Sequence, residues 1–107
     1  MPFEAYDHSF EFIRRLRRIA DLLATRHPDL VRQIRRAVTS VALNLGEGAG
    51  RTGKNRRHHY RIALGSAREV EAGLRCAEAW GDLQAEELEP VYRALDRLLA
   101  LLWGLTR

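Results

Sequence analysis

The chain has 107 residues, which is enough for one domain covering residues 1–107. Its 18 Lys and Arg outnumber its 14 Asp and Glu, and the excess is concentrated in residues 14–61, which hold 13 cations and 3 anions. One cysteine excludes an intrachain disulfide, the acidic N-terminal residues are unlike a secretory signal, and the apolar run 98–102 is too short to span a bilayer. We therefore expect a cytoplasmic protein in which Cys76 is a small buried hydrophobe.

The first half of the chain predicts two amphipathic helices. The first covers about residues 7–25, with Asp7 or Ser9 as its N-cap, and ends before Pro28. Its apolar stripe, widened by Phe12 and Ile19, consists of Tyr6, Phe10, Ile13, Leu16, Ala20 and Leu23. The second covers about residues 29–45, with an inner stripe of Leu30, Ile34, Ala37 or Val38, Val41 and Leu45. Glycines at positions 46, 48, 50 and 53 predict that this helix ends, since each costs about 1 kcal/mol relative to alanine.

The second half predicts two more helices. The third covers about residues 55–80, with Gly81 as its C-terminal cap and a stripe of Tyr60, Ala63, Ala67, Val70, Leu74 and Ala77. Gly65 and Ser66 in its middle predict the close approach of a neighbouring helix. The fourth begins between residues 84 and 90 and ends near Thr106, with a stripe of Leu88, Val91, Leu95, Leu98, Leu102 and Leu105.

Short links between long amphipathic helices favour antiparallel neighbours, so the predicted fold class is all-α, an up-down four-helix bundle. The fourth helix is apolar on more than one side, because Leu99, Leu101 and Trp103 lie beyond its core stripe. A single bundle buries one face of each helix, and this surplus therefore favours contact with another subunit.

Two glycine motifs in the central break lack the context that their chemistry requires. Residues 48–54 satisfy GxxxxGK, but Asn55 stands where a phosphate-binding P-loop needs Ser or Thr for magnesium. Glycines 48, 50 and 53 also match GxGxxG. Both motifs follow a buried strand in nucleotide-binding proteins, whereas an amphipathic helix precedes them here. We expect no nucleotide cofactor.

The histidines and carboxylates do not suggest a metal site or catalysis. His58 and His59 are adjacent and point about 100° apart on a helix, while His8 and His27 lack partner ligands. Glu69 and Glu71 are two residues apart and face different directions, which does not support acid–base chemistry. We expect a protein without metal, cofactor or enzymatic activity.

The basic segment at the start of the third helix is the main candidate for a binding site. It contains five cations and no acid: Arg51, Lys54, Arg56, Arg57 and Arg61. Cations at a helix N-terminus oppose the helix dipole but suit phosphate, so we interpret them as nucleic-acid contacts. Candidates that extend this surface are Arg32, Arg35 and Arg36, and also Arg14, Arg15, Arg17 and Arg18. The competing interpretation of this surface is a solvated polar face. Of the 18 cations, 17 are arginine, and this bias has two possible reasons, genomic base composition or bidentate contact with phosphate.

A second polar group is predicted where the second and third helices pair. It comprises Asn44, Glu47, Ser66 and Glu69, together with Arg51 and Gly65. Antiparallel pairing about the glycine break would bring some of them together. Mutual satisfaction of buried polar groups is favoured over a ligand site.

These segments resemble a known family. Residues 33–37, Ser40, Asn44, residues 47–48 and Arg51, followed by residues 63–66 and 69–71, are similar to the four-helix-bundle proteins encoded in intervening sequences of bacterial 23S ribosomal RNA genes. The resemblance covers about residues 29–81, and the flanking helices agree in length and pattern. Leu45-Gly46 stands where Ile-Ala is usual, and the loop that follows is richer in arginine.

The resemblance implies a homo-oligomer, with a pentamer of bundles around a central channel expected. It also implies kinship with the accessory variability determinant of diversity-generating retroelements, a basic bundle that binds nucleic acid and associates with a reverse transcriptase. It implies no catalysis. Our leading hypothesis is a non-catalytic pentamer that binds structured RNA or DNA through phosphates. The alternative is a protein-interaction scaffold whose arginines form subunit or partner interfaces.

Overall fold

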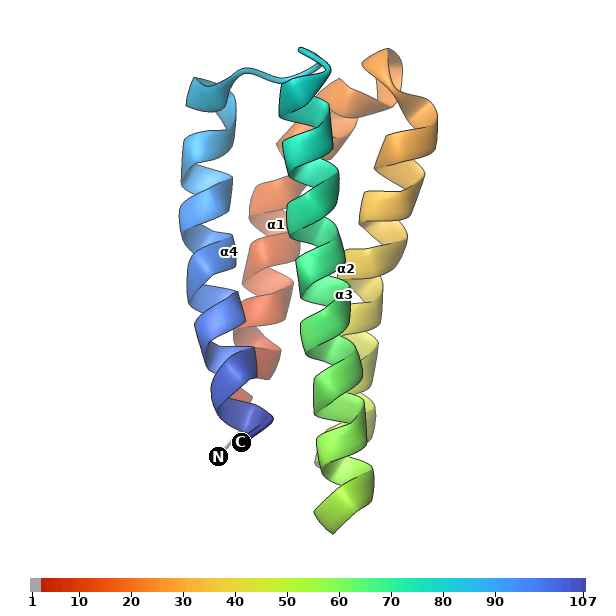
Figure 1. Ribbon diagram of the computed structural model, residues 1–107, viewed down its shortest axis with the longest axis vertical. Coiled ribbons are helices and arrows are strands. Elements are labelled where there is room, and N and C mark those ends of the chain that lie inside the picture. Colours follow the sequence, from red (N-terminus) through yellow and green to blue (C-terminus); the bar gives the residue numbers. More distant parts are fainter. Residues whose placement is uncertain (1–2) are drawn as a thin grey trace.

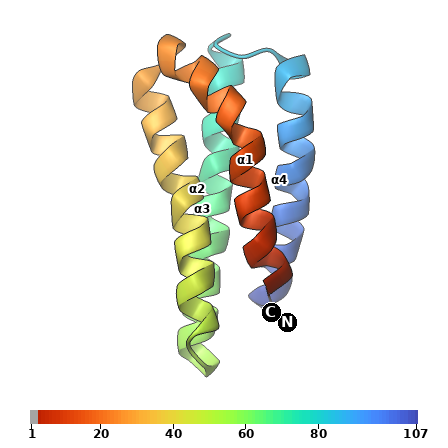
Figure 2. The same ribbon diagram turned by 180° about the vertical axis from the view of Figure 1, so that it is seen from behind.

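Four α-helices form the part of the chain that the structure, a computed structural model, describes: the backbone of residues 3–107. They are α1 (Phe3–Arg26), α2 (Pro28–Ala49), α3 (Gly53–Ala79) and α4 (Ala85–Leu105). Each helix runs antiparallel to the next along the chain, and α1 packs against both α2 and α4 to close the ring (Figures 1 and 2). The predicted all-α bundle of antiparallel helices is confirmed.

The ends of the helices are fixed by local chemistry, partly as predicted. Pro28 occupies the first turn of α2, where its missing N–H costs nothing. Gly81 follows α3 with a φ of +81° and donates its N–H to the carbonyl of Glu78. The N–H of Asp82 donates to the carbonyl of Ala77, so the two bonds satisfy carbonyls at the end of the helix. The prediction that Asp7 or Ser9 caps the first helix is wrong, since α1 begins at Phe3. Ser9 is fully buried, and its hydroxyl donates to the carbonyl of Tyr6 at 2.6 Å.

The glycines at positions 46 and 48 do not end α2, which continues to Ala49. A Cβ at position 48 would lie 2.7 Å from Cε1 of Tyr60, so the missing side chain allows the ring of Tyr60 to pack on the backbone of α2. Tyr60 is only 3% exposed. Burial of this aromatic ring offsets the roughly 1 kcal/mol helix penalty of Gly48, a gain that propensity alone does not reveal.

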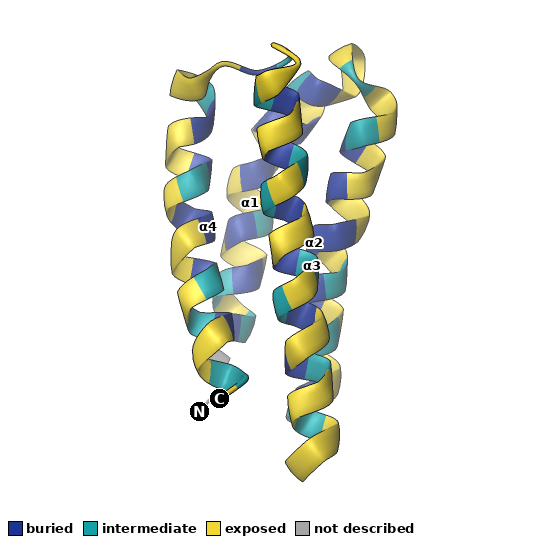
Figure 3. Cartoon of the chain, viewed as in Figure 1, coloured by how far each residue is buried: buried dark blue, intermediate teal, exposed yellow. Residues whose placement is uncertain are grey.

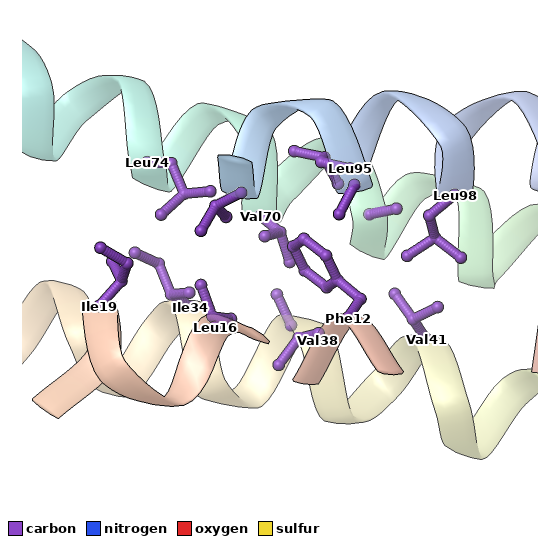
Figure 4. Packing of buried hydrophobic residues seen from close by; sticks show 14 of the residues in the cluster. Phe12, Leu16, Ile19, Ile34, Val38, Val41, Val70, Leu74, Leu95 and Leu98 are labelled. Carbon is purple, nitrogen blue, oxygen red and sulfur yellow. The ribbon is translucent and has the colours of Figure 1, made fainter. Parts of the chain in front are cut away.

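One apolar core runs through the middle of the bundle (Figures 3 and 4). Phe12 is fully buried and projects from α1 toward Val70 and Leu95 (Figure 4). Five predicted positions of α1 are buried, namely Phe12, Leu16, Ile19, Ala20 and Leu23, whereas Tyr6 and Ile13 are only partly buried. Ala5 and Ser9, which are not in the predicted stripe, are buried as well. Phe10, predicted to face the core, is 36% exposed. The predicted stripe of α3 is confirmed at every position.

Three expectations about packing and exposure are wrong or weakened. A Cβ at position 65 would meet no atom within 4 Å, so Gly65 is not needed for a close approach, whereas the hydroxyl of Ser66 does meet α2, 2.9 Å from that of Ser40. Close packing of α2 on α3 requires a glycine instead at Gly73, where a Cβ would lie 2.6 Å from Cγ1 of Ile34. Cys76 is exposed rather than buried, because it lies on the outer side of α3. Leu99 and Leu101 pack partly buried against the core, which weakens the argument for a subunit contact on α4.

Among the described residues, no helix is both long and apolar enough to cross a membrane.

Candidate nucleic-acid interface

The α2–α3 hairpin projects beyond the neighbouring ends of α1 and α4 (Figures 1 and 2). The continuation of α2 through Gly48 creates this projection, and residues 50–52 form the turn before α3 begins at Gly53. Gly53 has a φ of +56°, a left-handed conformation that favours glycine. The hairpin tip, defined here as residues 47–61, is largely exposed to solvent (Figure 3).

The five predicted cations of the basic segment all lie on the hairpin tip, in two chemical situations. Arg51 is paired with Glu47, with Nη2 and Nε at 2.6 and 3.0 Å from the same carboxylate oxygen, and Arg56 donates from Nε to the carbonyl of Arg51 at 2.9 Å. Lys54, Arg57 and Arg61 are exposed and form no ion pair with residues 3–107. The tip therefore presents three cations that are available to an anionic partner.

The electrostatics of the hairpin tip favour anions. The first turn of α3 contains no acidic residue, so the positive end of the helix dipole adds to the charge of Lys54. Glu47 is the one acid among residues 47–61. The hydrogen bond and charge of Arg51 lower the pKa of Glu47, which keeps this carboxylate ionised.

The three arginines predicted on the second helix do not join the hairpin tip. Arg32 is paired with Asp29 one turn away, whereas Arg35 and Arg36 are exposed without an ion pair in the described chain. Arg35 and Arg36 line a shallow groove with Thr39, Ser40 and Leu43. At 1.5 Å per residue, Arg36 lies about 16 Å along α2 from Glu47, where the tip begins. The structure thus divides the eight candidate cations into two separate groups.

Part of the predicted polar group is assembled between α2 and α3. The hydroxyls of Ser40 and Ser66 are 2.9 Å apart, and the Asn44 amide donates to the carbonyl and hydroxyl oxygens of Ser40 at 3.0 and 3.2 Å. This orientation directs Oδ1 of Asn44 toward Nδ1 of His59 at 3.0 Å, so Nδ1 carries the proton that is donated. The half-buried cluster is satisfied internally, which fits a structural role.

Of the predicted polar group, only Asn44 and Ser66 belong to this cluster, and its other two members, Ser40 and His59, are additions to the prediction. Glu47 is engaged with Arg51, and Glu69 is exposed on α3. His59 was not predicted to belong to this group, yet its contact joins the start of α3 to α2. The position of Ser40, four residues before Asn44 on one helix face, is a signal from which its participation is predictable.

The structure does not provide the context of a phosphate-binding P-loop. Gly48 and Ala49 belong to α2, and no β-strand occurs in residues 3–107. No group of three His, Cys, Asp or Glu residues in that same range could hold a metal ion. His27, for which the sequence suggested no partner, lies 3.0 Å from Asp82 through Nδ1 and links the two turns at the opposite end of the bundle.

These features define a class: a compact four-helix bundle with a projecting, basic helical hairpin. The chain belongs to the 23S rRNA-intervening sequence protein family, whose profile it matches over residues 2–104. Among solved structures it is similar to a protein of the S23 ribosomal protein family from Bacteroides thetaiotaomicron, with a TM-score of 0.85 and 22% sequence identity. That similarity covers 96% of this chain and 98% of the other, and it shows the fold. No curated protein matches the sequence significantly.

Proposed function

We propose that this protein is a non-catalytic nucleic-acid-binding protein that contacts the phosphates of structured RNA or DNA with the hairpin tip. The observation that carries the proposal is that the projecting α2–α3 hairpin (Figures 1 and 2) contains Lys54, Arg57 and Arg61, which are exposed and without ion pairs in residues 3–107. Neutralising phosphates with such cations releases counterions and gives affinity without regard to sequence.

The width of the hairpin tip supports contact with the backbone rather than with base edges. Each helix is about 10 to 12 Å in diameter, so two side by side are roughly 20 Å wide. The major groove of B-DNA is about 12 Å wide, and that of A-form RNA is narrower still. A two-helix tip therefore rests across the phosphates of a duplex instead of entering its groove.

We further infer that the protein acts as a homo-oligomer, in accordance with the pentamer that its resemblance to the 23S rRNA intervening-sequence proteins implies. Several tips in one assembly would multiply weak phosphate contacts into useful avidity. A role as an accessory to a reverse transcriptase is part of the same proposal and rests on resemblance alone. Copurification with a reverse transcriptase from the native host would support that role, and failure to copurify would count against it.

An alternative function, a protein-interaction scaffold, is favoured by a groove between α1 and α2. Its lining includes Phe10 and Ala42, and Leu43 at its edge is 67% exposed. Apolar side chains at such a site suit another protein better than nucleic acid. On this alternative, Leu43→Gln would disrupt the assembly and leave nucleic-acid affinity per chain unchanged.

The test of nucleic-acid binding is a salt titration of affinity for a labelled RNA hairpin and a DNA duplex of equal length. The double variant Arg57→Gln/Arg61→Gln removes two cations from the tip. The control Arg93→Gln/Arg97→Gln removes the same charge from α4, where both arginines are exposed and paired with acids. We expect the slope of log K against log salt to fall in magnitude by about 2 for the tip variant, and by much less for the control.

Oligomer mass, measured in parallel, separates the two functions. Lost affinity with unchanged mass supports a nucleic-acid interface at the tip. Dissociation of the assembly in the tip variant would show instead that these arginines belong to a subunit interface. The proposal fails if neither probe binds the unaltered protein at low salt.

A further inference from the structure

Trp103 is a large aromatic side chain that the bundle leaves exposed. It lies near the end of α4 and is 52% exposed, and the guanidinium of Arg107 lies 5.5 Å from its ring centroid. Leu99, Leu101 and Leu105, its apolar neighbours along α4, pack against the core. Trp103 is therefore an isolated aromatic beside a cation, not part of a broad apolar patch of the kind that subunits bury.

The antiparallel pairing of α3 and α4 places Trp103 beside the basic part of α3. The hydroxyl of Tyr92 donates to Glu78 at 3.0 Å, which fixes the register of the two helices. Trp103 is eleven residues beyond Tyr92, or about 16 Å along α4, and so lies level with about residue 67 of α3. Eleven residues are three helical turns, so Trp103 occupies the same α3-facing edge of α4 as Tyr92.

Cations lie on the outer side of α3, next to this edge. Arg61 lies seven residues before Arg68, a spacing that keeps these two arginines on one face of the helix, about 80° to 100° round the helix from Glu78 and away from the core. Both arginines are exposed and without an ion pair in residues 3–107. Arg61 also belongs to the hairpin tip, so the tip and the surroundings of Trp103 form one basic strip.

The strip ends where acidic residues begin. Arg75 is paired with Glu71 and lies over the ring of Tyr92, and Asp96 lies seven residues before Trp103 on α4. Negative charge thus occupies the middle of the α3–α4 edge, whereas the part from Trp103 to the tip is positive. This polarity limits an anionic ligand to the part of the edge between Trp103 and the tip.

We propose that Trp103 is a stacking platform for an unpaired base of single-stranded nucleic acid, with the adjoining phosphates held by Arg61 and Arg68. The inference rests on the proposed function and specifies which form of nucleic acid this edge takes. A base within a duplex is already stacked on both faces, whereas an unpaired base offers a free face to an indole ring. Aromatic side chains interleaved with cations are the general solution for single-strand binding.

The test uses Trp103 as its own reporter. In the variant Trp80→Phe, Trp103 is the one remaining tryptophan, and we expect oligouridylate or oligothymidylate to quench its fluorescence. A fully paired duplex of equal charge should leave the fluorescence nearly unchanged. The control Trp80→Ala, at an exposed tryptophan at the far end of α3, should bind both probes as the unaltered protein does.

Affinity for the two probes supplies the second measurement. Trp103→Ala should weaken single-strand binding by about 5- to 100-fold and leave the affinity for the duplex within about twofold of that of the unaltered protein. Trp103→Phe should retain most of the single-strand affinity. If Trp103→Ala binds the single strand as tightly as the unaltered protein does, the inference is wrong. Duplex binding by the unaltered protein would still support the proposed function in that case. A lower oligomer mass in Trp103→Ala also overturns it, since the indole then contacts another copy. If the unaltered protein binds neither probe, the proposed function itself is wrong.

Discussion

A methyl group added at Gly73 tests the close packing of α2 on α3. The Cβ of an alanine there would lie 2.6 Å from Cγ1 and 3.1 Å from Cδ1 of Ile34, which is 2% exposed. Isoleucine on a helix has one strongly preferred χ1 rotamer, so Cγ1 cannot swing away without leaving its rotamer or moving the helix. The added methyl must therefore separate α2 from α3 locally.

Gly65 provides a matched control in the same helix, because a Cβ there would have no neighbour within 4 Å. Both substitutions gain about 1 kcal/mol of helix propensity. Overpacking at Gly73 costs about 1 to 3 kcal/mol. We therefore expect Gly65→Ala to raise the free energy of unfolding by about 1 kcal/mol. The free energy of unfolding of Gly73→Ala should be about 1 to 3 kcal/mol lower than that of Gly65→Ala.

Urea denaturation followed by circular dichroism measures this difference, at one protein concentration so that any assembly affects both variants equally. In thermal unfolding, a difference of about 1 kcal/mol corresponds to a shift of about 4 to 8 °C for a domain near this size. Equal stabilisation by the two alanines would refute the reasoning, because it would show that α2 and α3 have room for a methyl group at Gly73.

Three further predictions concern polar groups. Asn44→Ala should lower the free energy of unfolding by about 1 to 2 kcal/mol in thermal denaturation, since it leaves half-buried partners unsatisfied. Burial and the hydrogen bond to Glu78 raise the pKa of Tyr92 to about 12. Because this folded-state value lies above the ordinary value of 10, stability linked to the neutral phenol is complete below pH 10 and is lost as the pH rises to about 12. Absorbance titration at high pH should lose this late tyrosine step in Tyr92→Phe, and an unchanged titration would contradict the assignment. Glu47→Gln should strengthen duplex binding at low salt, since it removes the acid that holds Arg51; weaker binding in a gel-shift or anisotropy assay would count against the hairpin tip as the interface.

The sequence was sufficient to predict the helices and most of the core. The three- and four-residue spacing of apolar residues on α2, α3 and α4 identifies the buried faces, because burial of one stripe is what stabilises an amphipathic helix in water. On α1 the prediction of the buried face holds from Phe12 to Leu23, apart from the partly buried Ile13, and fails in the first two turns. Two of its core positions are Ala5 and Ser9, which carry little apolar signal, while the exposed Phe10 carries a large one.

The candidate site was predicted in composition but not in arrangement. A run of cations at residues 51–61 is visible in the sequence alone, because charge needs no fold to be counted. Which of these cations are available is a matter of local geometry: Arg51 is held by Glu47, whereas Arg57 and Arg61 are not paired within residues 3–107. The distance of Arg36 from the tip likewise follows from the length of α2, which propensity underestimated.

The sequence by itself determined that the chain forms amphipathic helices with a basic centre, since periodicity and charge are local properties of the chain. Only the tertiary structure decided that the α2–α3 hairpin projects, because the packing of Tyr60 against Gly48 lets α2 continue past its glycines. It also set the register between α3 and α4, through the hydrogen bond from Tyr92 to Glu78. Both outcomes depend on contacts between residues of different helices, which no local pattern encodes.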